Sequence, residues 1–291
     1  MKKIDIHVHT AAKKGINRSG TNSTFCSPEE LLEKYEILGI EKGVILPLIN
    51  PECSAGSQSF EDIIEIVEKF PGRFTWFVNV DPRAIDNSPD ADLSYLIQYY
   101  KKRGAKGVGE ICANLAFDDP KVENLFNHCE KNNMPVTFHI SPMLGRYYGL
   151  YDEPGLPRLE GELKKFPGVK FLGHSQPFWA EISADLKPEY RNTYPPGVVT
   201  PGRIVELMRN YPNLCGDLSA GSAYNALTRD PEFGYAFMEE FKDKLYFGTD
   251  ICAPENDMKL SGWMDDAVAN GKISRDAYEK IGRENAAELL K

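Results

Sequence analysis

The sequence predicts a single (β/α)8 barrel, a TIM barrel of the α/β class, over residues 1–291. Eight short apolar runs alternate with helical patterns, and acidic residues and histidines gather where several of these runs end. Because near-continuous apolar strands separated by helices require parallel pairing with both faces covered, eight such units favour a closed barrel. An open doubly wound sheet is the alternative, but the residues after His9 lack the Gly-x-Gly-x-x-Gly turn of its phosphate-binding form.

The eight predicted strands are short runs, and long connections follow some of them. The strands cover residues 4–9, 43–49, 74–80, 106–111, 135–141, 169–175, 214–220 and 245–250. Between the first two, Ser27-Pro28-Glu29-Glu30 predicts a helix start, with a capping residue, a proline and an acid in order. The connections at 11–26, 142–156 and 176–200 exceed what a helix needs, so we expect them to form loops over a pocket.

The composition excludes several classes of partner. Lysine and arginine number 34 against 43 acidic residues, and the net charge of −9 argues against nucleic acid or an anionic membrane surface. No run approaches the roughly 20 apolar residues that span a bilayer, and the first strand leaves no room for a signal peptide. We therefore expect a cytoplasmic protein with reduced cysteines and a small-molecule partner, and a homo-oligomer stays open.

Histidine and acidic side chains lie at the predicted strand ends, where active sites of such barrels are found. His7 and His9 are two positions apart on one strand, so their side chains point to the same side. Burying such groups together without a metal would cost several kcal/mol, although each one alone has an ordinary structural role available. Imidazoles with carboxylates are typical ligands of Zn²⁺, with Mn²⁺, Fe²⁺ or Co²⁺ as substitutes. The predicted metal-site residues are His7, His9, Glu110, His139, His174 and Asp250.

This pattern resembles the amidohydrolase superfamily of metal-dependent barrels. More narrowly, the chain is similar to the amidohydrolase-related group that includes aminocarboxymuconate-semialdehyde decarboxylase and lactone hydrolases. The resemblance rests on the His-x-His of the first strand, the single histidines ending the fifth and sixth strands and the aspartate ending the eighth. It also covers the closing segment GRENAAELL at 282–290. It implies a metal-dependent barrel enzyme.

The resemblance also implies roles for single residues. Four of them, by position, would hold one ion: His7, His9, His139 and Asp250. His174 would stand beside that ion as proton shuttle and polariser. Glu110 departs from many single-metal members and matches TatD-type hydrolases, in which it would bridge two ions. One ion is favoured, with Glu110 as ligand or near neighbour, and two ions are the alternative.

The leading functional hypothesis is a metal-dependent hydrolase. The ion would lower the pKa of a bound water towards about 7, and the resulting hydroxide would attack the carbonyl of an amide, lactone or ester. Asp250 would take the proton from that water and pass it to the leaving group. His174 would hydrogen-bond the developing oxyanion.

Two other functions remain open. The first is non-oxidative decarboxylation of a small unsaturated or aromatic carboxylic acid, for which Arg18, Arg146 or Arg191 in the long loops offers a cation. The second is a metal-binding barrel without turnover. For either enzyme, Arg146 and Trp179 are the predicted substrate contacts, because basic and aromatic groups over a metal suit a small planar or anionic substrate. Packing between loops or against a second subunit is the competing interpretation of these two side chains.

Overall fold

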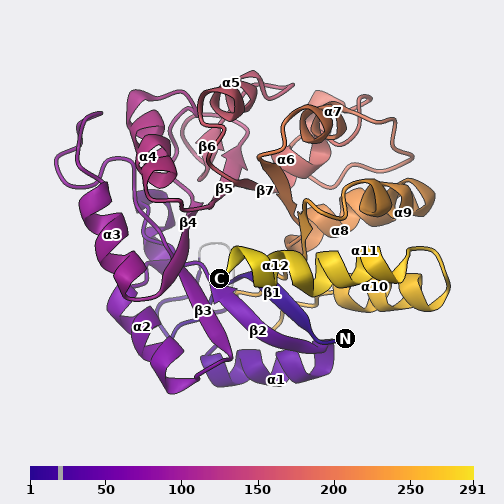
Figure 1. Cartoon of the computed structure of the whole chain (residues 1–291), viewed down its shortest axis with the longest axis horizontal. Helices are drawn as coiled ribbons and strands as arrows, with labels where there is room; N and C mark the ends of the chain where they lie inside the picture. The colour runs from indigo at the N-terminus through magenta and orange to yellow at the C-terminus, as the bar shows by residue number, and fades with distance from the viewer. Residues whose placement is uncertain (19–21) are drawn as a thin grey trace.

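The computed structural model describes residues 1–18 and 22–291, and in this part of the chain one parallel sheet forms the centre of the molecule. Each strand on the path pairs with the next, which is the topology of a barrel (Figure 1). The path runs through β1 (Lys3–Val8), β2 (Ile40–Ile45), β3 (Phe74–Val78), β4 (Ala105–Ile111), β5 (Val136–Ser141), β7 (Phe171–His174), β8 (Leu214–Asp217) and β9 (Leu245–Tyr246).

The ring closes between the first strand and the segment after β9. Val8 forms a parallel bridge with Ile251, and the amide of Ile6 donates to the carbonyl oxygen of Phe247 at 2.9 Å. These contacts confirm the predicted α/β barrel. The structure adds one short strand, β6 (Leu150–Tyr151), which pairs with β5 off the main path. It lies inside the connection that the sequence predicted as a loop.

Helices surround the strands. The larger ones are α1 (Pro28–Leu38), α2 (Phe60–Lys69), α3 (Ser94–Lys102), α4 (Pro120–Lys131), α5 (Pro157–Lys165), α7 (Arg203–Asn210), α8 (Ala220–Thr228), α9 (Pro231–Glu240) and α10 (Leu260–Ala269). Shorter helical segments are η1 (Pro51–Gly56), α6 (Gln176–Ala180), η2 (Pro188–Tyr190), α11 (Arg275–Glu279), η3 (Lys280–Glu284) and α12 (Asn285–Leu289). Among the described residues, no helix has the length and apolar character needed to cross a membrane.

The start of α1 follows the predicted capping signals. The Ser27 hydroxyl accepts a hydrogen bond from the amide of Glu30 at 3.1 Å, and the Glu30 carboxylate accepts one from the amide of Ser27 at 2.8 Å. Pro28 occupies the first helical turn, where its missing N–H leaves no helical hydrogen bond unmade. This reciprocal cap fixes where the chain leaves the long 11–26 connection and enters the helix.

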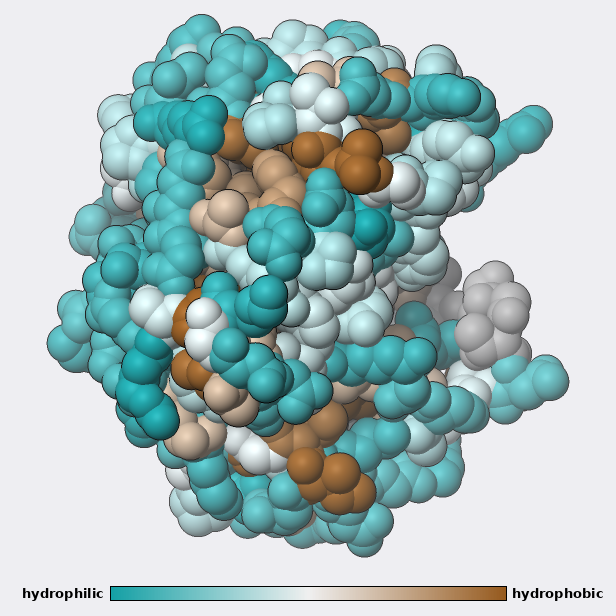
Figure 2. Space-filling view, turned by 90° about the vertical axis from the view of Figure 1, so that its right-hand side faces the viewer, coloured by the Kyte–Doolittle hydropathy of each residue, from teal (hydrophilic) through white to brown (hydrophobic). Residues whose placement is uncertain are grey.

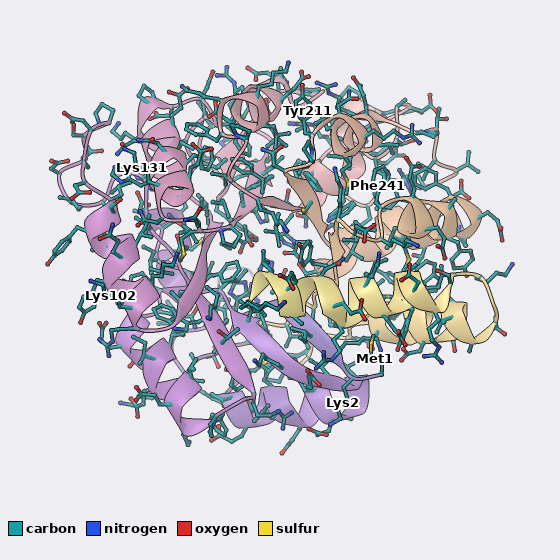
Figure 3. All side chains as sticks on the ribbon, in the orientation of Figure 1. Met1, Lys2, Lys102, Lys131, Tyr211 and Phe241 are labelled. Atoms are coloured by element: carbon teal, nitrogen blue, oxygen red, sulfur yellow. The ribbon has the colours of Figure 1, made fainter. Side chains whose placement is uncertain are left out.

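One end of the barrel is filled by apolar side chains and covered by α12. Ile4, Ile6, Phe77 and Leu172 belong to a separate inner cluster, and Ala286 of α12 packs with them. In Figure 1, α12 crosses the sheet close to the C-terminus. Figure 3 labels Lys2, Lys102, Lys131, Tyr211 and Phe241 around this ring; each comes shortly before a strand and so belongs to the same end. The carboxyl ends of the strands form the opposite end.

The outer surface of the helices is mostly polar. Figure 2 shows the side that carries α9, α10 and α11, where teal hydrophilic side chains dominate and brown apolar residues form small separate groups. The apolar faces of these helices turn inward: Phe237 of α9 and Met264 of α10 are both buried in the main core. The space between the helices and the strands is therefore filled by apolar side chains.

Candidate metal centre

The side chains that the sequence placed at strand ends converge in the structure at the carboxyl end of the barrel. His7 and His9 face each other, with 3.2 Å between their Nε2 atoms. A Glu110 carboxylate oxygen lies 3.5 and 3.6 Å from these two nitrogens, and an Asp250 oxygen lies 3.3 Å from that of His9. Two sets of three possible ligand atoms, each within 4.8 Å of one another, share His7: one adds Glu110 and His174, and the other adds His9 and Asp250.

The first strand presents both histidines because its pairing shifts register. Pairing of β1 with β2 is irregular between Asp5 and Val8, which is the mark of a bulge. Ile6 packs in the inner cluster, and its neighbour His7 also points into the barrel, so the simple alternation of the strand is broken there. The regular spacing resumes beyond the bulge and brings His9 to the same side as His7.

Hydrogen bonds fix the proton positions on these two rings. The Nδ1 atom of His7 lies 2.6 Å from a carboxylate oxygen of Asp217, and that of His9 lies 2.6 Å from the carbonyl oxygen of Leu46. Both partners are acceptors, so each Nδ1 carries a proton and each neutral ring turns a bare Nε2 lone pair towards the other. Two lone pairs at this separation repel, and a cation between them removes the repulsion. The residues present therefore fit a metal ion.

Without a metal, a proton takes the place of the cation. Burial opposes protonation of His7, but the Asp217 and Glu110 carboxylates outweigh it and raise the pKa of His7 well above its usual value. Burial likewise favours a neutral Glu110, yet His7 and His139 hold its pKa well below the usual range. Both shifts have one origin, namely a buried set of carboxylates that requires positive charge.

Asp250 and His174 also have shifted pKa values. Burial alone would raise the pKa of Asp250, but the hydrogen bond with His9 and the charge of His7 lower it to about 2. Burial and the neighbouring His7 lower the pKa of His174 to about 4, which keeps this imidazole neutral at pH 7. Asp250 thus offers an ionised carboxylate and His174 a neutral imidazole, which are ligand types of a borderline divalent cation.

His139 and His174 approach the centre from β5 and β7. The Nδ1 of His139 lies 2.8 Å from a Glu110 carboxylate oxygen, so His139 reaches the other groups through Glu110. The Nδ1 of His174 lies 2.9 Å from the Ser219 hydroxyl, and its Nε2 lies 3.8 Å from an Asp250 oxygen. Direct metal ligation by His139 stays a prediction.

Sequence reasoning missed two residues, Asp217 and Ser219, that contact the Nδ1 atoms of the candidate ligands. Asp217 ends β8 and contacts His7, and Ser219 follows it and contacts both His7 and His174. The amide of Ser219 donates to Asp217 at 3.0 Å, which holds this carboxylate in place. The sequence prediction extended this strand to residue 220, so Asp217 fell inside it, whereas β8 ends at Asp217 in the structure.

The two predicted substrate contacts lie outside the cavity at the centre. Trp179 is buried in the core, and its indole N–H donates to the carbonyl oxygen of Asp217 at 3.0 Å. Arg146 is exposed on the loop after β5. Arg191, a candidate cation for a decarboxylase, is buried against Glu181 with 3.2 Å between Nε and the carboxylate. Substrate contact by Arg146 or Trp179 stays a prediction that this geometry does not favour.

A small cavity of about 160 Å³ opens over the centre, with five of the six predicted ligands in its wall. Its apolar side is formed by Phe25 and Leu48, and its charged side includes Arg18 and Glu52. The Arg18 guanidinium lies over the Phe25 ring, 5.5 Å from its centroid. The cavity therefore combines a candidate metal centre, a cation and apolar walls in a space suited to a small molecule. The full lining is His9, Arg18, Phe25, Leu48, Glu52, Cys53, Gly56, Glu110, His139, Tyr148, His174 and Asp250.

The family model described as Amidohydrolase matches residues 4–291. The chain belongs to the amidohydrolase family. Members of this superfamily are metal-dependent hydrolases or decarboxylases. The match covers every strand of the amidohydrolase barrel described above and all of the predicted ligands. A search of curated proteins finds no match to the sequence.

Solved structures with low sequence identity share this fold. A 2,6-dihydroxybenzoate decarboxylase from Rhizobium is 17% identical, with a TM-score of 0.64 and coverage of 100% of this chain and 98% of its own. A probable 2-pyrone-4,6-dicarboxylic acid hydrolase from Acinetobacter baumannii is 13% identical, with a TM-score of 0.61 and coverage of 100% and 99%. A dihydroxybenzoic acid decarboxylase from Polaromonas, 17% identical with a TM-score of 0.60 and coverage of 99% and 96%, contains manganese and the inhibitor 2-nitroresorcinol. Both types of reaction therefore occur on this fold.

Proposed function

We propose that this amidohydrolase is a divalent-metal-dependent hydrolase that cleaves an amide, lactone or ester bond in a small planar carboxylate. The exposure of Asp250 carries this proposal: its side chain is 27% exposed, whereas those of His7, His9, Glu110 and His174 are at most 5% exposed. Among these five groups, Asp250 is the one that a water molecule in the cavity can approach most freely. An ionised carboxylate in that position is suited to accept a proton.

Asp250 and His174 divide the proposed chemistry between them. A divalent ion held by the imidazoles and carboxylates supplies a Lewis acid that acidifies water and polarises a carbonyl. Asp250 takes the proton of the attacking water and returns it to the leaving oxygen or nitrogen. The Ser219 hydroxyl lies 2.9 Å from Nδ1 of His174. In the tautomer that this role requires, the hydroxyl donates to Nδ1, and the ring proton on Nε2 would donate to the developing oxyanion.

The cavity supports a small anionic substrate. Arg18 places a guanidinium in the wall, and guanidinium is suited to bind a carboxylate through two parallel hydrogen bonds. Phe25 and Leu48 offer flat apolar surface for a ring. The decarboxylases and the hydrolase with this fold carry the names of ring compounds with carboxylate groups, which favours the same substrate class here.

The proposed cofactor is one ion per chain. The two ligand sets share His7, so a single ion held by His7 would be within reach of members of both. Zinc is the proposed metal, with manganese, iron or cobalt as substitutes, because imidazole and carboxylate ligands bind all of them. A pair of ions with Glu110 between them is the alternative.

Substitution of Asp250 tests the proposed proton transfer. We expect Asp250→Asn to lower kcat by roughly 100-fold or more on a confirmed substrate, since general-base catalysis contributes about 10²–10⁴-fold. Asp257→Asn is the control, because the Asp257 side chain is 80% exposed and lies outside the cavity. Metal content measured on the same samples separates loss of the base from loss of the ion. Undiminished turnover in Asp250→Asn contradicts the role.

Decarboxylation is the second candidate function, favoured by the two decarboxylases that share the fold and by Arg18 in the cavity wall. Incubation in ¹⁸O-labelled water with 2-pyrone-4,6-dicarboxylate and with 2,6-dihydroxybenzoate distinguishes the two reactions. Hydrolysis incorporates one labelled oxygen into the product without releasing carbon dioxide. Carbon dioxide release without uptake of labelled oxygen selects the decarboxylase.

A further inference from the structure

A tyrosine on the loop after β5 lies over the candidate metal centre. Tyr148 lines the cavity, and its ring centroid is 4.4 Å from that of His139. Its neighbour Tyr147 is about equally exposed, at 42% against 44%, but does not line the cavity. The two adjacent tyrosines therefore differ in position, and Tyr148 alone of the pair faces the site.

The loop that carries Tyr148 is tied down by Asn114, which follows β4. The Asn114 amide nitrogen donates to the carbonyl oxygens of Met143 at 3.2 Å and Gly149 at 3.1 Å. Its side-chain oxygen accepts from the amide of Gly145. One side chain thus holds three points of the loop on both sides of Tyr148.

The residue after Tyr148 must be glycine. Gly149 has a φ of +104°, and a Cβ built there would lie 2.7 Å from the carbonyl oxygen of His139. The amide of Gly149 also donates to the carbonyl oxygen of Cys112 at 2.8 Å. This close backbone approach sets where the chain passes over β5, and hence where the Tyr148 ring lies.

Tyr148 shares the cavity wall with Glu110 and Asp250, and its ring lies against that of His139 although the residue is 44% exposed. Hydrogen bonds found across residues 1–18 and 22–291 include none to the Tyr148 hydroxyl. A phenol beside a metal centre, with its donor unused by the protein, is available to a bound molecule.

We propose that the Tyr148 hydroxyl donates a hydrogen bond to an oxygen of the substrate and orients its ring over the metal centre. This inference rests on the proposed function, because it assumes a small planar carboxylate in the cavity. It adds a substrate contact in the same cavity that Arg18 lines. The two groups together would hold a ring at two points, which fixes its angle to the ligands as well as its place.

Binding by metal-loaded protein tests the proposal without relying on turnover. The probes are 2,6-dihydroxybenzoate and 2-pyrone-4,6-dicarboxylate, measured by titration calorimetry against the wild type, Tyr148→Phe and Tyr147→Phe. We expect Tyr148→Phe to weaken binding of at least one probe by about 10-fold or more, since a buried hydrogen-bond acceptor loses its partner. Tyr147→Phe should stay within about twofold of the wild type.

The outcomes separate this inference from the proposed function. Equal affinity of Tyr148→Phe and the wild type for a probe that binds overturns the role of Tyr148 and leaves the substrate class intact. Failure of both probes to bind the metal-loaded wild type overturns the substrate class and this inference with it. Asn114→Ala gives a second check, because release of the loop should weaken binding in the same direction while Tyr148 keeps its hydroxyl.

Discussion

Asp217 determines how His7 presents its metal-binding nitrogen. The carboxylate accepts from Nδ1 of His7, and the amide of Ser219 and the indole of Trp179 hold the Asp217 side chain and backbone in turn. Such a carboxylate fixes the ring orientation and increases the basicity of the opposite nitrogen. The residue therefore acts on the ion through His7.

Removing the charge of Asp217 is expected to weaken metal binding. Asp217→Asn keeps the size of the side chain but lowers metal affinity by roughly 10–100-fold, because an amide accepts a hydrogen bond more weakly and leaves the His7 tautomer less fixed. Titration against a fluorescent chelator measures the change. Asp81→Asn serves as the control, since Asp81 is also a buried carboxylate but contacts Arg83 and Asn50. Equal metal affinity in Asp217→Asn and the wild type contradicts the argument.

At the scale of elements, α5 contains two glutamates whose pKa values are shifted in opposite directions. Glu162 is 3% exposed, one of its carboxylate oxygens lacks a hydrogen-bond partner among the described residues, and burial with the nearby Glu123 raises its pKa to about 7. Glu160 bonds to Tyr211, Lys164 and Arg203, which lower its pKa to about 2. One helix thus contains an acid that resists ionisation and one that favours it.

This contrast predicts a pH-dependent effect on stability. The unfolded chain ionises Glu162 near pH 4.5 and the folded chain near pH 7, so the contribution of this group to stability is lost as the pH rises through that window. Glu162→Gln should therefore gain on the order of 2 kcal/mol over the wild type at pH 8 and much less at pH 4.5. Melting temperatures at both pH values measure it. Glu160→Gln should instead lose stability at pH 8, and a gain in both variants would contradict this account.

How much the sequence could predict differs between strands and loops. The strand order and the convergence of Glu110, His174 and Asp250 followed from hydrophobic runs and the rule that polar groups at strand ends meet. The bulge in β1 and the placement of Tyr148 did not follow, because they depend on contacts between distant segments, such as Asn114 with the loop after β5. The sequence analysis selected Arg146 in this loop by residue type, and residue type alone does not show that Tyr148 is the residue of this loop that lines the cavity.

At the scale of the whole molecule, one buried carboxylate joins the first strand, β1, to the segment after β9 that closes the barrel. Asp5 accepts hydrogen bonds from the amide of Thr249 at 2.9 Å, from its hydroxyl at 2.6 Å and from the Tyr35 hydroxyl at 2.7 Å. Two residues on, the carbonyl oxygen of His7 accepts from the amide of Asp250 at 2.8 Å. A metal ion bound by His7 and Asp250 would add a second link across this seam.

Metal removal is therefore expected to destabilise the whole barrel. Ions that bind the folded chain alone add about 2.7 kcal/mol at a free concentration of 100 times Kd, so stripping with a chelator should lower the melting temperature. Zinc or manganese should restore it, and magnesium, which prefers oxygen ligands, should not. Elemental analysis of the restored protein should give about one ion per chain. A ratio near two contradicts the single-ion arrangement, and an unchanged melting temperature contradicts the link across the seam.

The seam also has a consequence for the order of events during synthesis. His7 and His9 are synthesised before Asp250, which at about 5–20 residues per second is added roughly 10–50 seconds later. During that interval the two histidines lack the Asp250 carboxylate and the segment around Ile251 that closes the barrel beside them. Metal binding in the proposed arrangement therefore requires that the chain has been synthesised past Asp250. A chain that ends earlier contains the histidines but lacks the Asp250 carboxylate.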